Sequence, residues 1–467
     1  MLLRRLTSLA CEPVDAASLA VFRIGIGVIV LAEIGRFFLH GWIRDHYLTP
    51  PFLFKYYGFE WVVPLPGNGL FWLFGVMGLL ALMVTLGLYY RIAAIGLFFA
   101  FSYVFLLDQG NYLNQYYLLL SVLMLFSFLP ADREYSISAR RQRNSVAPVT
   151  PRWSVWVLRL QFEVMLIYAG LVKINADWLA GQPLGLWFAE RADHLPVVGS
   201  VLTTSGVSIG AAYAVVLLHV VGAPLLMLRR TRFVVFVLYV CFHLGNSILF
   251  HIGLFPWITL LGTLMFFDPD WPRQVAQRIT SRDEQTVSSK EKSSPVFDLK
   301  ITTSVFLAVF FIFQILFPLR YLLYPGNVSW TNEGHWFSWR MKLHDKRGDA
   351  RFIVTDNVTG QRWEVDPGDC LRPRQIQLMA VTPDMILQFA HYLERDWKQR
   401  EGISDVRINA VVMCSLNGRP PAPLVDHRQD LTHKSRSLGH YNWILPLNIP
   451  LNPPDMPAHL SYRGIGG

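Results

Sequence analysis

Long apolar windows recur along the first two thirds of the chain and predict membrane-spanning helices. The windows fall at 18–39, 69–89, 92–107, 113–130, 154–174, 206–228, 232–250, 253–267 and 301–323. Because an α-helix rises about 1.5 Å per residue, roughly 20 apolar residues cross the ~30 Å hydrocarbon core of a bilayer. Several windows are short and two abut, so we expect eight or nine transmembrane helices.

The pattern of apolar positions changes after residue 323. Segments 335–343, 350–356, 361–366 and 406–416 are typical of strands, and 357–360 is a hairpin signal. Residues 380–400 have apolar positions at helical spacing. We therefore predict a helical membrane domain at 1–269, a polar linker at 270–299, a last transmembrane helix at 300–323, and a small α+β (β-rich) domain at 324–467.

Composition and charge agree with a polytopic α-helical membrane protein. Hydrophobic residues make up 52% of the chain and charged residues 16%. Arginines and lysines gather in alternate loops, whereas the intervening loops are mixed or acidic, with Asp177, Glu190 and Asp193 in one of them. The positive-inside rule then places the N-terminus and the linker in the cytoplasm and the 324–467 domain outside it. Since topology accounts for the net charge of +9, we expect no nucleic-acid partner.

Cysteine usage leaves one question open and excludes one class of site. Cys370 and Cys414 both fall in the outer domain, where they could pair in an oxidising compartment or remain two free thiols. No Cys/His spacing suggests zinc, so we expect no metal ligands.

Polar residues inside the apolar windows share one depth on the outer side of the membrane. Three windows contribute them: the fourth at its outer end, the seventh in its outer half, and the fifth at its end. They are Asn114, Gln115, His243, Asn246, Lys173 and, nearby, Tyr168. Each alone could serve as an interhelical hydrogen-bonding group. Their convergence favours a functional site.

Lys173 has two interpretations. Its ammonium could extend from the end of the fifth window to the aqueous interface, which is what its position alone favours. Alternatively, a partly desolvated amine has a lowered pKa and serves as a neutral base near pH 7. The polar residues at the same depth favour the second interpretation.

Several segments resemble the vitamin K-dependent γ-glutamyl carboxylases, in particular bacterial-type homologues with an HTTM-like membrane domain. The segments are Asp15–Arg23, Tyr103–Asp108, Ala169–Trp178, Phe242–Phe250, Asp268–Arg273, Trp330–Asn332 and Phe337–Trp339. Each segment alone is a weak signal, but their order and spacing over nearly the whole chain are specific.

The resemblance implies an activity and its participants. Lys173 matches the family's catalytic lysine, which deprotonates reduced vitamin K, a phylloquinone or menaquinone hydroquinone. Reaction with dioxygen gives the 2,3-epoxide, and the strong base formed on the way removes a γ-proton from a peptidyl glutamate, which adds to carbon dioxide. Asn114 and Gln115 would act with Lys173. We expect a bacterial inner membrane protein, or an ER membrane protein if the chain is eukaryotic, whose partners are the lipid membrane and a glutamate-containing peptide or protein.

Further roles follow from the resemblance more loosely. His243, Asn246 and Tyr168 are the expected cofactor-binding residues. Residues His344 and Arg428 fall where the family handles glutamate, and Arg428 suits a carboxylate through bidentate hydrogen bonds, although exposure on the surface is the commoner fate of an arginine. The remaining candidate, Trp339, is either an aromatic wall of the substrate site or domain core, and we favour core.

Two departures from the family keep alternatives open. Where the family typically has Asn-His, this chain has Asn114-Gln115, and glutamine does not titrate near neutrality. A basic residue after His344 appears as Lys346, which lacks the bidentate fork of arginine. An epoxidase with vestigial carboxylation and a non-catalytic quinone-binding scaffold are the alternatives. Retention of Lys173 argues against the scaffold, while Gln115 leaves the epoxidase open.

Overall fold

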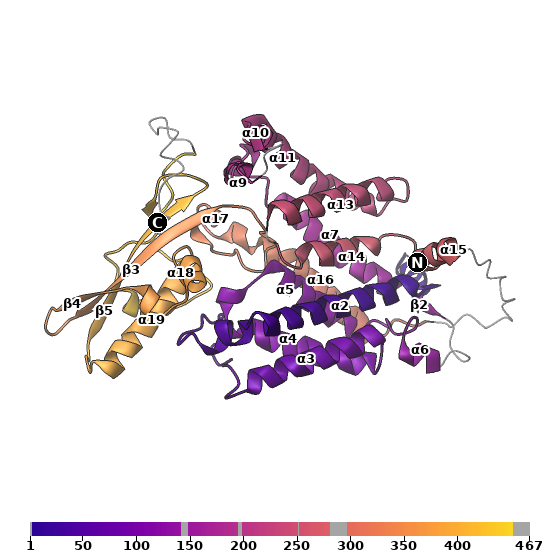
Figure 1. The fold of residues 1–467 in the computed structure, drawn as a ribbon, viewed down its shortest axis with the longest axis horizontal. Coiled ribbons are helices and arrows are strands. Elements are labelled where there is room, and N and C mark those ends of the chain that lie inside the picture. Colours follow the sequence, from indigo (N-terminus) through magenta and orange to yellow (C-terminus); the bar gives the residue numbers. More distant parts are fainter. Residues whose placement is uncertain (1, 142–147, 195–198, 251, 281–296, 452–467) are drawn as a thin grey trace.

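The protein has a body of packed helices and a smaller part that contains the main sheet. The computed structural model describes residues 2–141, 148–194, 199–250, 252–280 and 297–451. The long helices lie side by side along the long axis of the molecule. The strands β3 (Lys346–Asp356), β4 (Arg362–Val365) and β5 (Val406–Leu416) lie at the end opposite the N-terminus (Figure 1).

The predicted apolar windows form helices, which confirms the polytopic helical fold. Among the described residues, seven helical stretches are long and apolar enough to cross a membrane: α2 (Ala17–Leu39), α3 (Gly69–Leu86), α4 (Tyr90–Leu107), α7 (Arg152–Leu171), α11–η3–α12 (Ser205–Leu217, Leu218–Gly222, Ala223–Leu226), α13 (Arg232–Leu249) and α16–η4 (Ile301–Leu316, Phe317–Leu323). Two shorter apolar helices, α5 (Asn114–Phe126) and α14 (Phe255–Leu264), occupy the fourth and eighth windows. The expected number of eight or nine transmembrane helices is therefore reached only when these two shorter helices are counted together with the seven long ones.

Short elements connect the long helices. They are α1 (Leu2–Cys11), β1 (Pro13–Asp15), η1 (Arg44–Leu48), η2 (Gln109–Asn111), α6 (Ile137–Arg141), β2 (Val149–Pro151), α8 (Ala176–Leu179), α9 (Leu184–Ala192), α10 (Gly199–Leu202) and α15 (Trp271–Thr280). The part of the 270–299 linker that α15 covers is thus helical rather than irregular, and its residues 281–296 lie outside the described residues.

A buried arginine stabilises the end of the helical body that lies away from the sheet. Arg23, on α2, is fully buried and donates hydrogen bonds to the main-chain oxygens of Ala131 (2.8 Å) and Tyr135 (2.6 Å). Because these carbonyls belong to the segment after α5, the guanidinium joins that segment to α2. A charge inside the helical body is tolerated when several acceptors surround it in this way.

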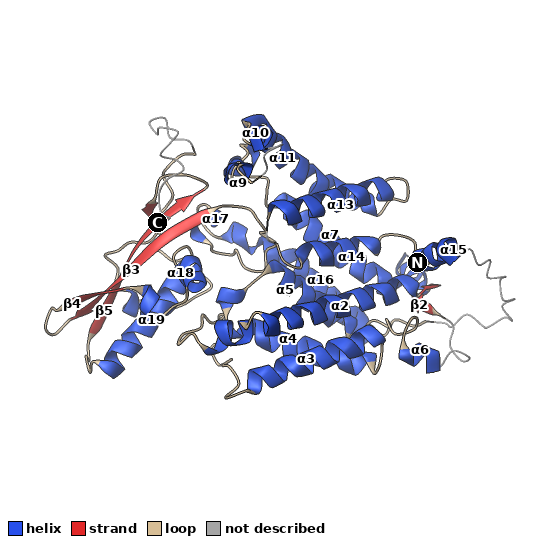
Figure 2. Cartoon of the chain, in the orientation of Figure 1, coloured by secondary structure: helices blue, strands red, loops and turns tan. Residues whose placement is uncertain are grey.

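The outer domain is an antiparallel sheet covered by helices (Figure 2). The strand order is β4-β3-β5-β6, with bounds Arg362–Val365, Lys346–Asp356, Val406–Leu416 and Ala422–Pro423. The remaining elements are α17 (Val328–Thr331), η5 (Pro367–Asp369), α18 (Pro373–Met379), α19 (Pro383–Arg400) and η6 (Leu431–His433). The predicted strands 350–356, 361–366 and 406–416 and the predicted helix 380–400 are confirmed. The apolar face of α19 packs on the sheet, where the ring of Phe389 lies 4.9 Å from that of Phe352 on β3.

The predicted strand at 335–343 is wrong. Residues 332–345, which we call the junction loop, contain no strand and run between the helical body and the sheet. Positive φ angles at Phe337 (57°), Trp339 (54°) and Lys342 (43°) are incompatible with extended backbone. The aromatic side chains of the loop pack on the helical body instead, and the ring of Trp339 lies 4.6 Å from that of Tyr117 on α5. Tertiary packing therefore overrides the alternating pattern of the sequence.

The cysteines of the outer domain are unpaired. Cys414 is buried in the sheet, Cys370 is half-buried, and both are free thiols. Of the two open alternatives, the structure contains the one with two free thiols.

Candidate active site

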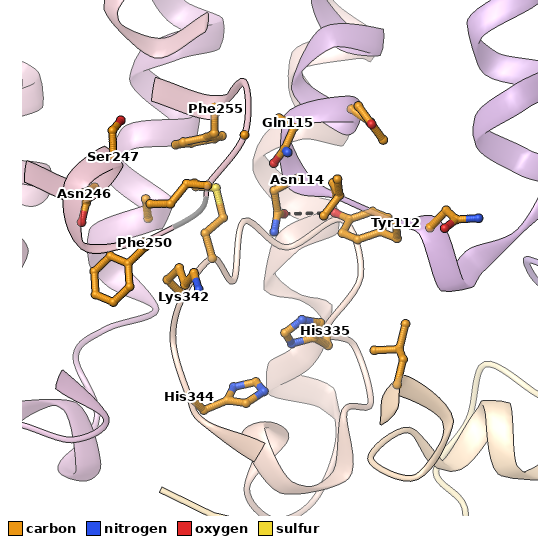
Figure 3. Close-up of a pocket in the computed structure, with 18 of the residues that line it drawn as sticks. Tyr112, Asn114, Gln115, Asn246, Ser247, Phe250, Phe255, His335, Lys342 and His344 are labelled. Carbon is orange, nitrogen blue, oxygen red and sulfur yellow. Dashed lines mark hydrogen bonds between the residues drawn. The ribbon is translucent and has the colours of Figure 1, made fainter. Parts of the chain in front are cut away.

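One large cavity lies where the outer ends of the helices meet the outer domain. Its volume is about 1010 Å³. Six of the predicted site residues line it: Asn114, Gln115, Lys173, His243, Asn246 and His344. Asn114 and Gln115 approach from α5, and His335 and His344 lie across from them on the outer-domain side (Figure 3). The shared depth predicted from three apolar windows thus corresponds to a shared cavity.

Lys173 is buried at the membrane end of this cavity. It follows α7 by two residues, beyond the end of the span at Leu171, and is 5% exposed. Its Nζ donates hydrogen bonds to the main-chain oxygens of Ala169 (2.7 Å) and Met341 (3.1 Å). The side chain does not extend to the aqueous interface, so its position agrees with the interpretation of Lys173 as a desolvated amine.

The surroundings of Lys173 disfavour its charged form. It forms no ion pair with a carboxylate within the described part of the chain. Burial, together with the positive charge of Arg340, lowers the pKa of Lys173 to about 7. A neutral amine is therefore well populated near neutral pH, which is the requirement for a general base.

The turn after Lys173 is fixed by its own side chains. Asn175 caps α8: its Oδ1 accepts a hydrogen bond from the Trp178 amide (3.1 Å), and its Nδ2 donates to the Val172 oxygen (3.1 Å). The indole of Trp178 lies 5.1 Å from the Lys173 ammonium and donates a hydrogen bond to the Ala212 oxygen (3.1 Å). Asn175 and Trp178 thus hold the lysine in one position.

Asn114 is oriented by a hydrogen-bond chain from the junction loop. The amide of Phe337 donates to the hydroxyl of Tyr112 (3.0 Å), and that hydroxyl donates to Oδ1 of Asn114 (3.1 Å), the bond drawn in Figure 3. Since the amide N–H can only donate, the tyrosine hydrogen is directed to the asparagine oxygen. The NH₂ group of Asn114 remains a donor for the cavity.

Gln115 lies against the turn between α13 and α14. Its Nε2 is 3.3 Å from the place where a Cβ on Gly253 would stand, and Gly253 has a φ of +65°. A larger residue at Gly253 would therefore be strained and would displace the Gln115 amide.

Aromatic rings and two histidines form the membrane wall of the cavity. His243 is 2% exposed, and its Nε2 has no hydrogen-bond partner among the described residues. The rings of Phe242 and Phe255 lie 5.1 and 6.2 Å from the His243 ring. The second histidine, His219, pairs its Nδ1 with the Val215 oxygen at 2.8 Å, so Nδ1 carries the proton and Nε2 is an acceptor. Aromatic walls with orphaned polar atoms suit a flat ring that carries polar groups.

Sequence reasoning missed His219 because its window contains a local irregularity. Residues Leu218–Gly222 form a π-helical turn, and π-turns are frequent at functional sites. A Cβ on Gly170 would stand 2.8 Å from the Cβ of His219, so α7 and this turn approach closely. Neither the turn nor the approach has a signal in apolar periodicity.

The outer wall of the cavity is basic. The rings of His335 and His344 lie 5.5 Å apart, and within the described part of the chain the Nδ1 of each has no hydrogen-bond partner. Burial and neighbouring positive charges lower the pKa of His344 to about 3 and that of His335 well below its usual value, so both are neutral. Lys346 donates to the main-chain oxygens of Val381 (2.6 Å) and Trp330, and burial lowers its pKa to about 8.

Two lysines give the outer wall its positive charge. Neither Lys346 nor Lys342 forms an ion pair with a carboxylate in the described ranges. Lys342 instead lies over the rings of Trp187 (5.3 Å) and Phe250 (5.2 Å). Sequence reasoning missed His335 and Lys342 because it assigned both to a strand. Basic groups in a cavity that form no ion pair among the described residues suit an anionic ligand.

Three predicted site residues do not line the cavity. Tyr168 is buried, and its hydroxyl donates to the Ile315 oxygen of the last span. Trp339 is fully buried beside Tyr117, so it is a core residue, but of the helical body rather than of the outer domain. Arg428 is exposed on a turn after β6.

Comparison with known families matches nearly all of the described chain. Residues 11–271 match the HTTM domain, and residues 299–449 match the domain described as "Vitamin K-dependent gamma-carboxylase, lumenal domain". The first region contains Lys173 and Gln115, and the second contains Met341, His344 and Lys346. No solved structure matches the chain.

Proposed function

The chain belongs to the vitamin K-dependent gamma-carboxylase family, and from this premise we propose that it couples the epoxidation of reduced vitamin K to the γ-carboxylation of peptidyl glutamate. The observation that carries the proposal is Lys173. It is a buried amine with a lowered pKa, and it lies in a cavity that both the membrane region and the outer domain line. Such an amine can accept a proton at neutral pH without a neighbouring carboxylate.

The membrane wall fits a reduced naphthoquinone. Phe242, Phe250 and Phe255 supply aromatic surface, and the orphaned Nε2 of His243 supplies a polar contact. Trp257 both lines the cavity and is 52% exposed on the helical body, so an apolar chain attached to the ring has a route to lipid beside it. When bound, the reduced naphthoquinone supplies, through its oxidation by dioxygen to the 2,3-epoxide, a base strong enough for the γ-proton of glutamate.

The residues of this chain prepare that chemistry. Neutral Lys173 would accept a proton from a hydroxyl group of the reduced naphthoquinone. Asn114 and Gln115 line the cavity, and their NH₂ groups would donate hydrogen bonds to oxygen atoms that gain negative charge. Met341 and Trp178 cover the lysine and exclude water from it, which keeps the amine desolvated.

The outer wall suits the glutamate side chain. A carboxylate there would accept charge-assisted hydrogen bonds from Lys346 and a hydrogen bond from neutral His344 or His335. Because these residues come from the domain at the outer end of the helices, a peptide can reach them from water while the naphthoquinone enters from lipid. The cavity between the two parts therefore suits a reaction that joins a lipid-soluble and a water-soluble reactant.

Gln115 is the observation that favours a second candidate function, which is epoxidation without carboxylation. Its amide lines the cavity where the family typically has histidine, and it cannot carry a proton. One experiment separates the two functions. Purified protein receives reduced vitamin K, a glutamate peptide and labelled carbon dioxide, and epoxide and fixed label are measured separately. Both products support the coupled reaction, epoxide alone supports the epoxidase, and neither product contradicts both.

A further inference from the structure

A buried ion pair joins the segment that carries Lys173 to the outer domain. Asp177 lies four residues after Lys173, in α8, and Arg419 follows β5. The guanidinium of Arg419 donates from both Nη atoms to the two carboxylate oxygens of Asp177, at 2.6 and 2.7 Å. The side chains are 7% and 13% exposed. This bidentate geometry fixes both distance and orientation.

The carboxylate is ionised in this arrangement. Burial by itself raises the pKa of Asp177, but the hydrogen bonds from Arg419 and Asn417 outweigh it, and the pKa falls below its usual value. Arg419 is itself fixed, because it also donates to the main-chain oxygens of Ile449 (3.0 Å) and Leu416 (3.1 Å). The pair is thus anchored on the outer-domain side by two main-chain acceptors.

Asn417 extends the connection to the other side of the cavity. Its Nδ2 donates to Asp177 (2.7 Å), and its Oδ1 accepts a hydrogen bond from the amide of Asp345 (2.9 Å). The amide of Asn417 also donates to the oxygen of Asp345 (2.8 Å). Asp345 is the neighbour of His344, so one asparagine side chain bridges the segment of the lysine and the segment of the histidine.

The register of the sheet explains why Asn417 can do this. Lys346 at the start of β3 pairs with Leu416 at the end of β5, so the next residues, Asp345 and Asn417, face each other. Asn417 has a φ of +53°, a conformation that asparagine tolerates better than most residues. Next to it, Gly418 packs on Leu186 of α9, where a Cβ would come within 3.3 Å. The turn after β5 therefore packs directly on the helical body.

We propose that Asn417 and Arg419 are positioning residues that fix the distance between Lys173 and the glutamate-binding wall at His344. This inference rests on the proposed function, in which the base generated at the membrane wall must reach a γ-carbon held at the outer wall. A misplacement of about 1 Å costs roughly 10²-fold in rate. If the connection is broken, the reduced naphthoquinone is still oxidised, but glutamate loses its γ-proton in a smaller share of the turnovers. The two half-reactions then run uncoupled.

The chain offers a matched control at a second contact between the two parts. Arg436 of the outer domain is also mostly buried and also bridges them, pairing with Glu60 (3.0 Å) and Asp384 (2.9 Å) and donating to the Lys55 oxygen (2.9 Å). It contacts neither the Lys173 segment nor the His344 segment. Arg419→Ala and Arg436→Ala remove comparable arginines, but only the first breaks the proposed connection.

The test uses the full-length chain in detergent and two readouts. In Arg419→Ala, we expect carboxylation to fall about 10²-fold and epoxidation less than tenfold, so the ratio of epoxide to fixed label rises at least tenfold. Hydrogen exchange should accelerate in peptides covering 172–180 and 341–346. Arg436→Ala should leave both the ratio and these peptides unchanged.

Asn417→Gly keeps the proposal testable if Arg419→Ala does not fold. Glycine tolerates the positive φ, so this variant removes the side-chain bridge with little strain. We expect a smaller rise in the same ratio and faster exchange in both peptides. An unchanged ratio and unchanged exchange in Asn417→Gly, or equal effects in Arg436→Ala, would overturn the inference. Wild-type protein that forms neither epoxide nor fixed label would contradict the proposed function, whereas the exchange measurement would still test the connection.

Discussion

The ammonium nitrogen of Lys173 donates a hydrogen bond to the main-chain oxygen of Met341, 3.1 Å away. Lys173 belongs to the region that matches the HTTM domain, and Met341 belongs to the region that matches the carboxylase lumenal domain. The junction loop that carries Met341 therefore covers the proposed base. Because burial lowers the pKa of the amine, the outer domain helps to keep Lys173 unprotonated near neutral pH.

Replacement of Lys173 tests the general base. In Lys173→Ala, we expect epoxidation to fall by about 10²–10⁴-fold, the usual contribution of a general base. Added small amines should restore part of the activity. Lys55→Ala is the matched control, because Lys55 also donates to two main-chain oxygens at the domain boundary (Val62, 2.6 Å; Leu107, 3.0 Å) but does not line the cavity. Unchanged epoxidation in Lys173→Ala would exclude the base role.

The pKa of Lys173 predicts the pH dependence of epoxidation. With a pKa of about 7, the amine is mostly protonated below pH 7 and cannot accept a proton. The rate should therefore rise about tenfold per pH unit up to pH 7 and level off above it. In Lys173→Ala rescued by amines, the midpoint should move with the pKa of the added amine. A wild-type midpoint near 10, the range of a solvated lysine, would contradict a desolvated base.

Gln115 is predicted to act as a neutral donor. Removal of one donor to a developing oxyanion costs about 10²–10³ in rate, so Gln115→Ala should lower epoxidation and carboxylation together by that factor. Gln115→His keeps a donor and should change both rates less than about threefold. A large gain of carboxylation in Gln115→His would indicate that this position must carry a proton and that the native protein is chiefly an epoxidase.

Lys346 is predicted to bind the glutamate carboxylate. Because a hydrogen bond to a charged group contributes roughly 1.5–3 kcal/mol, Lys346→Met should raise the KM for a glutamate peptide about 10- to 100-fold. The KM for reduced vitamin K should not change, and Lys346→Arg should restore peptide affinity. Lys398→Met is the control, since Lys398 is an exposed lysine of the same domain that pairs with Glu394. Equal KM values in Lys346→Met and wild type would remove Lys346 from the substrate site.

The outer domain is predicted to lie outside the cytoplasm. Val358 is 75% exposed at the tip of the β3–β4 hairpin, so Val358→Cys should react with a membrane-impermeant maleimide added to intact cells. Arg230→Cys, in an exposed loop at the opposite ends of the helices, should react only after permeabilisation. Both variants carry Cys241→Ser, which removes an exposed native thiol. The reverse labelling pattern would invert the proposed topology.

Local patterns determined the elements whose environment is uniform along their length. A helix in lipid must be apolar around most of its surface, so windows such as 18–39 and 301–323 predicted α2 and α16–η4 within a few residues. In helix α19 and strands β3 and β5, side chains alternate regularly between core and surface, and this periodicity was sufficient to predict the three elements. The junction loop has a comparable alternation, but its aromatic side chains pack on α5 rather than on a sheet partner.

For the candidate site, the apolar pattern alone predicts which polar residues occur at one depth of the membrane: Asn114, Gln115, Lys173, His243 and Asn246. It does not predict that Tyr168 faces the last span, because a helical window does not say which neighbour covers each face. The burial of Lys173 beneath Met341, and the presence of His335 and Lys346 in the same cavity, follow from the folded arrangement of distant segments. Depth follows from the local distribution of apolar residues, whereas burial and pKa depend on contacts between segments more than 150 residues apart.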